Sequence, residues 1–259
     1  MTLLDRVFAP GGITARFEPV VDMTHNPVGC AYLEGLVRGP AGTNLETADI
    51  LFSYIRRKRE SARMDRLCIS AVLDAARTLA PEVAVGFNVD AATLSADTRF
   101  AEWLCGAARA HGLAESRLVA EIVEHTWPSD MRAFHAATAA LREKGVRIAL
   151  DDVGRAHSNY RLMLETRPDF FKIDRYFVAG AHADPMRREV IRSIAGLARS
   201  FGARVVAEGI EHPADLECVL GLGVELAQGY LLLPLLARYT RREDDETRRK
   251  KRVEEHGYR

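Results

Sequence analysis

Residues 146–152, Val-Arg-Ile-Ala-Leu-Asp-Asp, carry the pattern that decides the fold: an apolar run that ends in two acids. Similar short runs, rich in Val, Ile and Phe and ending in a polar residue, recur on both sides of it. They are Val83–Asn88, Leu118–Glu121, Phe170–Asp174, Arg204–Glu208 and Val224–Gln228. Near-continuous apolar runs of this length are typical of strands covered on both faces. The sequence therefore predicts a sheet that is buried between other elements.

Segments with apolar residues at helical spacing separate these runs. They include Ala101–His111, Met131–Lys144 and Met186–Phe201. Strands that alternate with helices indicate a parallel sheet, and Thr14–Val21 and Gly29–Val37 are two further strand candidates. About eight strands in a chain of 259 residues predict an α/β fold, a TIM-like (β/α)8 barrel. Pro19 cannot donate a ladder hydrogen bond, so we expect an irregular or edge-type first strand.

Composition and charge narrow the class of protein. Nearly half of the residues, 47%, are apolar, and 36 basic residues balance 36 acidic ones. This balance gives no support for binding a DNA or RNA duplex, and no apolar run reaches the roughly 18 residues needed to cross a membrane. The four cysteines are scattered without a C-x-x-C pair, which favours reduced thiols in a cytoplasmic protein.

One domain is expected to fill most of the chain. No linker or low-complexity tract divides residues 1–240, which we assign to the barrel. Residues 241–259 form a tail dominated by charges of both signs. Such a composition is typical of a solvated helix or a disordered segment, and a docking role is the alternative.

Polar residues gather where the predicted strands end. In a barrel these ends meet at one mouth, where active sites form. The candidates for metal ligands are Glu34, Asn88, Glu121, Asp151, Asp152 and Glu208. Any single acid at a strand end is ordinarily a helix cap or a solvated residue. Five carboxylates together repel one another, however, and Lys172 alone cannot neutralise them. Oxygen ligands suit Mg²⁺ or Mn²⁺.

The adjacent acids Asp151 and Asp152 favour two ions. Neighbouring residues of a strand point to opposite faces, but at a strand end the chain turns, and both side chains can then reach the mouth. One carboxylate can bridge two ions, and ions about 3.5–4 Å apart are a common device in phosphoryl chemistry. The sequence therefore predicts metal-assisted hydrolysis of a phosphate ester.

The same residues resemble those of a known family. Glu34-Gly-Leu-Val-Arg38 is similar to the E-A-L-x-R signature of the EAL-domain phosphodiesterases, which open cyclic di-GMP to linear pGpG. Further matches to the family's motifs follow in order over residues 14–236. They are Asn88, Glu121–Glu124, Asp151–Gly154, Lys172–Phe177, Val206–Glu211 and Gln228–Pro234. Each motif alone is weak, but the ordered set is specific.

The resemblance implies a role for each matching position. Glu34, Asn88, Glu121 and Asp151 would hold one metal ion, and Asp151, Asp152 and Glu208 the other. The implied catalytic residues are Glu34, Lys172, Glu208 and Gln228, with Lys172 orienting or deprotonating the attacking water. The implied substrate-binding residues are Leu36, Arg38, Gln228 and Pro234. Glu124 and Asp174 would support the loops of the site. Cyclic di-GMP is the implied partner, with a possible homodimer.

The chain departs from the family's pattern at three places, of which the altered loop favours a sensor. Gly35 stands where the signature has Ala, and Glu18 replaces the usual Gln before Pro19, which adds negative charge near an anionic ligand. The loop Val153–Asn159 lacks the family's second glycine, which is Ala156 here. The alternatives to an enzyme are a sensor that binds cyclic di-GMP without cleaving it and an interaction domain that ignores the nucleotide. Sensors of this kind typically lack an acid or the lysine, and this chain has them all.

Overall fold

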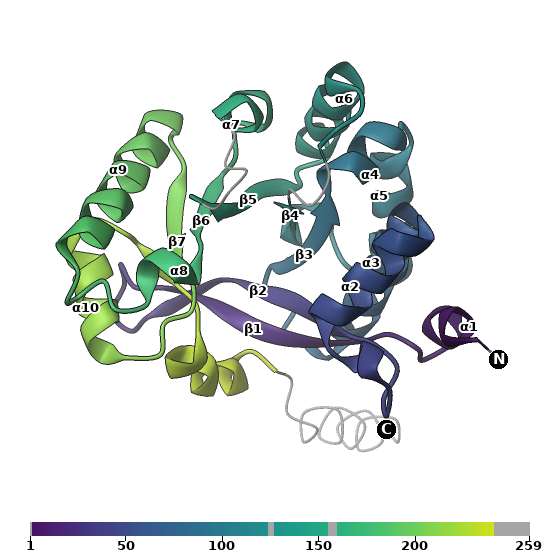
Figure 1. The fold of residues 1–259 in the computed structure, drawn as a ribbon, viewed down its shortest axis with the longest axis horizontal. Coiled ribbons are helices and arrows are strands. Elements are labelled where there is room, and N and C mark those ends of the chain that lie inside the picture. Colours follow the sequence, from purple (N-terminus) through teal and green to yellow (C-terminus); the bar gives the residue numbers. More distant parts are fainter. Residues whose placement is uncertain (1, 124–126, 155–159, 241–259) are drawn as a thin grey trace, which may run out of the picture.

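A computed structural model describes residues 2–123, 127–154 and 160–240. Within them the strands form one closed barrel in sequence order, with helices outside it (Figure 1). The strands are β1 (Thr14–Asp22), β2 (Gly29–Arg38), β3 (Val85–Asp90), β4 (Leu118–Val123), β5 (Arg147–Val153), β6 (Phe170–Ile173), β7 (Arg204–Ala207) and β8 (Leu226–Ala227). The predicted TIM-like barrel is therefore confirmed.

The helices follow the predicted alternation from β3 onward. They are α1 (Leu3–Phe8), α2 (Ala48–Lys58), α3 (Ser61–Ala75), α4 (Ala91–Ala96), α5 (Phe100–Ala110), α6 (Met131–Glu143), α7 (Tyr160–Thr166), α8 (Arg175–Val178), α9 (Pro185–Phe201) and α10 (Pro213–Gly221). Short 3-10 segments add η1 (Asn44–Glu46), η2 (Ala76–Thr78), η3 (Glu115–Arg117) and η4 (Tyr230–Arg238). The longest of the described α-helices, α9, has Asp184 as its N-cap, Pro185 in its first turn and Gly202, in the left-handed region, as its C-cap. These are the signals expected at helix ends.

The first strand departs from the predicted parallel sheet. β1 pairs antiparallel with both β2 and β8. The reason is the connection between β1 and β2, residues 23–28, which is too short for the dozen or more residues of a parallel crossover. The strand is irregular, as Pro19 predicted, with a register shift between Val20 and Val21. The edge-type alternative is wrong, because the barrel closes through β1.

The barrel interior has an apolar floor beneath a polar mouth. The floor is one cluster of buried side chains, seven from strands and Ala84 from the residue just before β3. Its members are Val20, Tyr32, Ala84, Val119, Ala149, Phe170, Val206 and Leu226. Two residues farther along a strand the side chain faces the same way. In β2 and β4–β8 that step reaches the mouth residues Glu34, Glu121, Asp151, Lys172, Glu208 and Gln228. The alternation of the strands thus positions the site.

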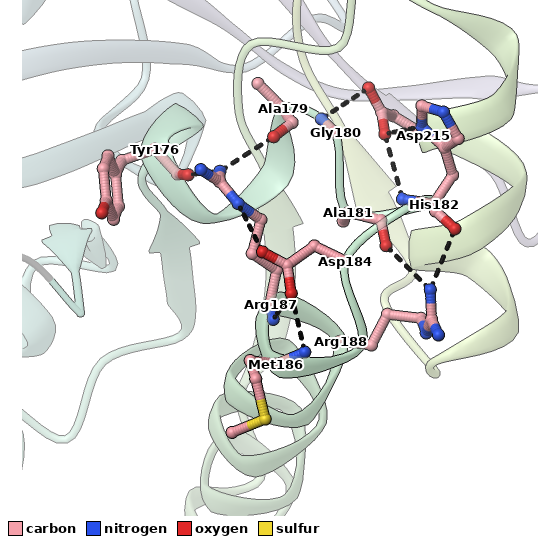
Figure 2. Close-up of polar contacts among 10 residues, drawn as sticks. All are labelled: Tyr176, Ala179, Gly180, Ala181, His182, Asp184, Met186, Arg187, Arg188 and Asp215. Atoms are coloured by element: carbon pink, nitrogen blue, oxygen red, sulfur yellow. Dashed lines mark hydrogen bonds and ion pairs between the residues drawn. The ribbon is translucent and has the colours of Figure 1, made fainter.

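A buried carboxylate fixes the segment that follows the Lys172 strand. Asp215 of α10 accepts hydrogen bonds from the backbone N–H groups of Gly180 and His182, at 3.1 and 3.3 Å, and lies 2.7 Å from His182 Nδ1 (Figure 2). Arg187 of α9 donates to the carbonyls of Tyr176 and Ala179. These contacts hold α8 between β6 and α9, next to the mouth.

Two further predictions concern the whole chain. None of the helices in the described ranges is long and apolar enough to cross a membrane. All four cysteines are free, with Cys68 and Cys105 buried and Cys30 and Cys218 half-buried. The predicted tail, residues 241–259, lies outside the described residues.

Candidate active site

Lys172 of β6 lies at the centre of the mouth acids. Its Nζ atom is 3.0 Å from Glu34 Oε2, 2.7 Å from Glu208 Oε1 and 3.3 Å from Asp151 Oδ1. It also contacts Glu121 of β4. The lysine side chain is only 1% exposed and that of Glu121 is fully buried. A single ammonium thus meets four carboxylates, three from strands β2, β4 and β5 and one that directly follows β7, away from bulk water.

Glu34 of β2 receives two amide donors in addition to the ammonium. Asn88 Nδ2 of β3 donates to Glu34 Oε1 at 3.0 Å, and Gln228 Nε2, just after β8, donates to Glu34 Oε2 at 2.7 Å. Hydrogen bonds from both amides fix the carboxylate at the point where β1, β2 and β8 meet. The structure therefore brings together Asn88, Gln228 and the acids that the sequence singled out.

The pKa values of the acids differ because their partners differ. Burial raises the pKa of Glu121 well above its ordinary value, and the nearby charge of Glu34 adds to this. Burial likewise raises the pKa of Glu208. For Glu34, burial is outweighed by Lys172, Gln228 and Asn88, and the pKa is lowered. The pocket thus favours the charged form of Glu34 and disfavours the charged forms of Glu121 and Glu208.

The second acid group is built by an irregularity in β5. Single ligand atoms of Asp151, Asp152 and Glu208 all lie within 4.8 Å of one another. The pairing of β5 with β6 shifts between Leu150 and Val153, and Asp152 takes a left-handed backbone with φ of 53°. Aspartate tolerates this conformation better than most residues. A bulge inside the strand, rather than the expected turn at its end, lets both adjacent carboxylates face the mouth.

Unsatisfied oxygens show that these residues fit divalent cations. Asn88 Oδ1, Glu121 Oε1 and Gln228 Oε1 are buried and have no hydrogen-bond partner among the described residues. A buried oxygen without a donor is costly, and hard cations bind carboxylate and amide oxygens of this kind. The donor set therefore suits hard divalent cations.

Two glycines shape the site. A Cβ atom at Gly86 of β3 would lie 2.3 Å from Glu121 Oε1 and 2.8 Å from the ring of Tyr32. The missing side chain therefore makes room for the innermost acid. Gly154, with φ of 100°, faces Phe177 of α8, where a Cβ would lie 2.6 Å from the ring. The close approach ties the end of β5 to α8.

Two cavities flank the acids and share Glu34 and Leu36. The larger, about 490 Å³, runs between the end of β2 and helices α2 and α3, and Arg38, Asn88 and Asp152 also line it. The smaller, about 260 Å³, lies toward β1 and β8. Of the predicted substrate-binding residues, Leu36, Arg38 and Gln228 line these cavities. Pro234 is exposed in η4 and lines neither of them.

The predicted supporting residues have different outcomes. Asp174 caps α8, where its carboxylate accepts a 2.7 Å hydrogen bond from the backbone N–H of Tyr176. Glu124 and residues 155–159 of the altered loop lie outside the described residues. The resemblance put Glu18 near the anionic ligand but the sequence assigned it no role in the site, although it lines the smaller cavity. The signal was available: in an antiparallel β1, the residue two before the inward-facing Val20 reaches the mouth.

Comparison with known proteins agrees with this geometry. The EAL domain family model matches residues 3–234. The cyclic di-GMP phosphodiesterase PdeL of Escherichia coli K12 is 34% identical over 118 residues, which cover 46% of this chain and 33% of PdeL. Cyclic di-GMP phosphodiesterase PA2567 of Pseudomonas aeruginosa is 31% identical over 148 residues, or 57% of this chain and 25% of that protein. The matched segments thus span a third or less of these relatives.

Solved structures show the same fold. BlrP1 of Klebsiella pneumoniae, in a complex with calcium and cyclic di-GMP, has a TM-score of 0.76 at 24% identity, covering 86% of this chain and 56% of that one. An EAL domain protein of Listeria monocytogenes has a TM-score of 0.74 at 22% identity, covering 88% of both chains. At these identities the likeness concerns the fold alone.

Proposed function

The chain belongs to the EAL domain family, and we propose that it hydrolyses cyclic di-GMP to linear pGpG with the help of divalent metal ions. The observation that carries the proposal is the complete set of acids around Lys172, whose ammonium meets four carboxylates. A domain that only binds the nucleotide needs no such concentration of negative charge. Two relatives named above are cyclic di-GMP phosphodiesterases, which favours the same reaction.

The metal ions would occupy two adjoining groups of ligands. Glu34, Asn88, Glu121 and Asp151 would hold one ion, and Asp151, Asp152 and Glu208 the other. Bound Mg²⁺ or Mn²⁺ would supply a water that is nucleophilic near neutral pH and would offset the charge that develops on the phosphate. The unpaired buried oxygens of Asn88 and Glu121 support this assignment.

The remaining residues would position the reactants. Lys172, a donor with three N–H bonds and no acceptor, would hydrogen-bond the attacking water and orient it toward phosphorus. Gln228, held against Glu34 at 2.7 Å, would fix the water or the substrate beside it. Arg38, at the rim of the larger cavity, would hold a phosphate oxygen through its planar guanidinium.

The proposal is tested by product analysis. Purified protein is incubated with cyclic di-GMP in EDTA, Mg²⁺ or Mn²⁺, and linear pGpG is separated by chromatography. Glu34→Gln keeps the shape of the side chain but removes its charge. Glu102→Gln makes the same change on α5, where the side chain is 70% exposed and pairs with Arg99, and is the matched control.

Three results are distinguishable. Product that forms only with metal, persists in Glu102→Gln and is lost in Glu34→Gln supports the enzyme. Intact substrate with every metal, together with tight binding, rejects the enzyme in favour of the sensor alternative. Intact substrate without binding rejects a cyclic di-GMP function. A cytoplasmic location and a homodimer stay predictions.

A further inference from the structure

The apolar floor of the barrel includes one polar side chain, that of Tyr32 on β2. The other seven members of the floor cluster are Val, Ala, Phe or Leu residues. Tyr32 is fully buried, and its ring centroid lies 5.3 Å from that of Phe170, on the opposite side of the barrel. Its hydroxyl has no hydrogen-bond partner among the described residues. Because a buried hydroxyl without a partner is costly, packing alone would favour phenylalanine at this position.

The Tyr32 ring lies next to the innermost acid of the mouth. The point that a Cβ atom of Gly86 would occupy is 2.3 Å from Glu121 Oε1 and 2.8 Å from Tyr32 Cε2. Cε2 adjoins the ring carbon that bears the hydroxyl, so this end of the ring is the end beside the acid. Burial raises the pKa of the Tyr32 phenol well above its ordinary value, and the charge of Glu121 raises it further. The hydroxyl therefore keeps its proton and can donate it in a hydrogen bond.

Unpaired acceptors surround this unpaired donor. The buried side-chain atoms of the described residues that have neither a hydrogen bond nor an ion pair are Tyr32 Oη, Asn88 Oδ1, Glu121 Oε1 and Gln228 Oε1. The amide and carboxylate oxygens among them accept hydrogen bonds and cannot donate, whereas a phenol can do both. Tyr32 is thus the one group of this set that can supply a proton to the others.

A metal-bound carboxylate needs such a donor. In this structure Glu121 contacts the Lys172 ammonium, which also serves three other carboxylates. Carboxylates that bind a metal ion are in turn hydrogen-bonded by neighbouring groups, which fix their orientation. We propose that Tyr32 is a positioning residue of the metal site, whose hydroxyl donates a hydrogen bond to the Glu121 carboxylate and holds it in place for a divalent cation. This inference rests on the proposed function.

Tyr32→Phe removes only the hydroxyl and therefore isolates the predicted hydrogen bond. We would measure Mn²⁺ affinity by calorimetric titration without nucleotide, and stability in EDTA by urea denaturation. Loss of a hydrogen bond to a metal ligand typically weakens metal binding about 10–100-fold, and we expect a loss in this range. In EDTA the variant should be at least as stable as wild type, because the hydroxyl has no partner in the metal-free fold.

Tyr176→Phe is the matched control, since it makes the same change on α8, where the side chain is 67% exposed. It should equal wild type in both measurements. A spectroscopic signal locates the effect at Tyr32. Hydrogen bonding changes the near-ultraviolet absorption of a phenol, so Mg²⁺, which does not absorb there, should produce a tyrosine difference spectrum in wild type and in Tyr176→Phe. The spectrum should be missing from Tyr32→Phe at saturating Mg²⁺.

The outcomes separate this inference from the proposed function. Weaker Mn²⁺ binding by Tyr32→Phe, with undiminished stability in EDTA and a difference spectrum that depends on Tyr32, supports the hydrogen bond. Equal Mn²⁺ affinity in Tyr32→Phe and wild type, or no difference spectrum in wild type, overturns it and leaves the phosphodiesterase proposal intact. Lower stability of Tyr32→Phe in EDTA also overturns it, because the hydroxyl then serves the metal-free fold. A wild-type protein that neither binds divalent cations nor hydrolyses cyclic di-GMP overturns both.

Discussion

Lys172 Nζ lies 2.7 Å from Oε1 of Glu208, the residue that directly follows the next strand of the barrel, β7. This ion pair belongs to a group in which one ammonium serves four buried acids. Replacing one partner of a buried ion pair typically costs about 3–5 kcal/mol, because the remaining charge stays unpaired. We therefore expect Lys172→Met to lower the free energy of unfolding by about that amount in EDTA, as measured by urea denaturation.

Metal ions should reverse this loss if they neutralise the same acids. With saturating Mn²⁺, Lys172→Met should regain most of its stability, because binding to the native state alone stabilises it. Lys144→Met, at an exposed position after α6, is the control and should change little in either condition. An equal deficit with and without Mn²⁺ would contradict the assignment of these acids to metal.

The mouth acids were predictable because their spacing follows from strand geometry. A residue at the polar end of each apolar run lands on one rim whenever the strands are parallel, and this holds for Glu121, Asp151 and Glu208. The same reasoning failed for β1, since its direction depends on the length of a loop rather than on the pattern within the strand. Glu18 was consequently put near the ligand only by the resemblance to the family, and not by the strand pattern.

Gly86→Ala should disturb the innermost acid. The added Cβ would meet Glu121 Oε1 at 2.3 Å and the Tyr32 ring at 2.8 Å, and overpacking of a core costs typically 1–3 kcal/mol. We expect a loss of stability in this range together with weaker Mn²⁺ binding in a calorimetric titration. Gly106→Ala, on α5 with no atom near its Cβ position, should be neutral or slightly stabilising. Unchanged Mn²⁺ affinity in Gly86→Ala would reject the role of Glu121.

Contacts between distant segments explain what the sequence alone did not reveal. Gly35 stands where the E-A-L signature has Ala, and the sequence offered no reason for the change because the neighbours of β2 outside the barrel were unknown. The structure places Val72 of α3 against it, with the two methyl carbons 2.5 and 2.6 Å from the position of an added Cβ. Whether position 35 requires a glycine depends on how closely α3 packs against β2. No local sequence pattern specifies that distance.

This contact predicts coupling between Gly35 and Val72. Gly35→Ala alone should lose about 1–3 kcal/mol of unfolding free energy through overpacking, and Val72→Ala alone should lose stability by leaving a cavity. Because the new methyl group fills the space that the valine vacates, the double variant should lose less than the sum. A double-mutant cycle in urea should give a coupling energy of about 1 kcal/mol or more. Additive losses would mean that α3 shifts instead.

Asp65 of α3 should make stability depend on pH. Its carboxylate is buried and accepts hydrogen bonds from the backbone N–H of Asp90 and the hydroxyl of Thr93. Burial outweighs these bonds and raises the pKa of Asp65 from 3.8 to about 6. Between those values the native state holds a proton that the unfolded chain has released. The contribution of Asp65 to stability is therefore greatest below pH 4 and is lost as the pH rises through 6.

The pH dependence can be isolated by comparing variants. A pKa difference of about two units corresponds to roughly 3 kcal/mol between pH 4 and 7. Asp65→Asn cannot ionise. The unfolding free energy of this variant minus that of wild type, both measured in EDTA, should therefore increase by about this amount as the pH rises from 4 to 7. Asp49→Asn, at an exposed position of α2, should run parallel to wild type. If Asp65→Asn also runs parallel to wild type, the buried carboxylate does not lose its proton over this range. Another group in the fold then causes the loss of stability with rising pH.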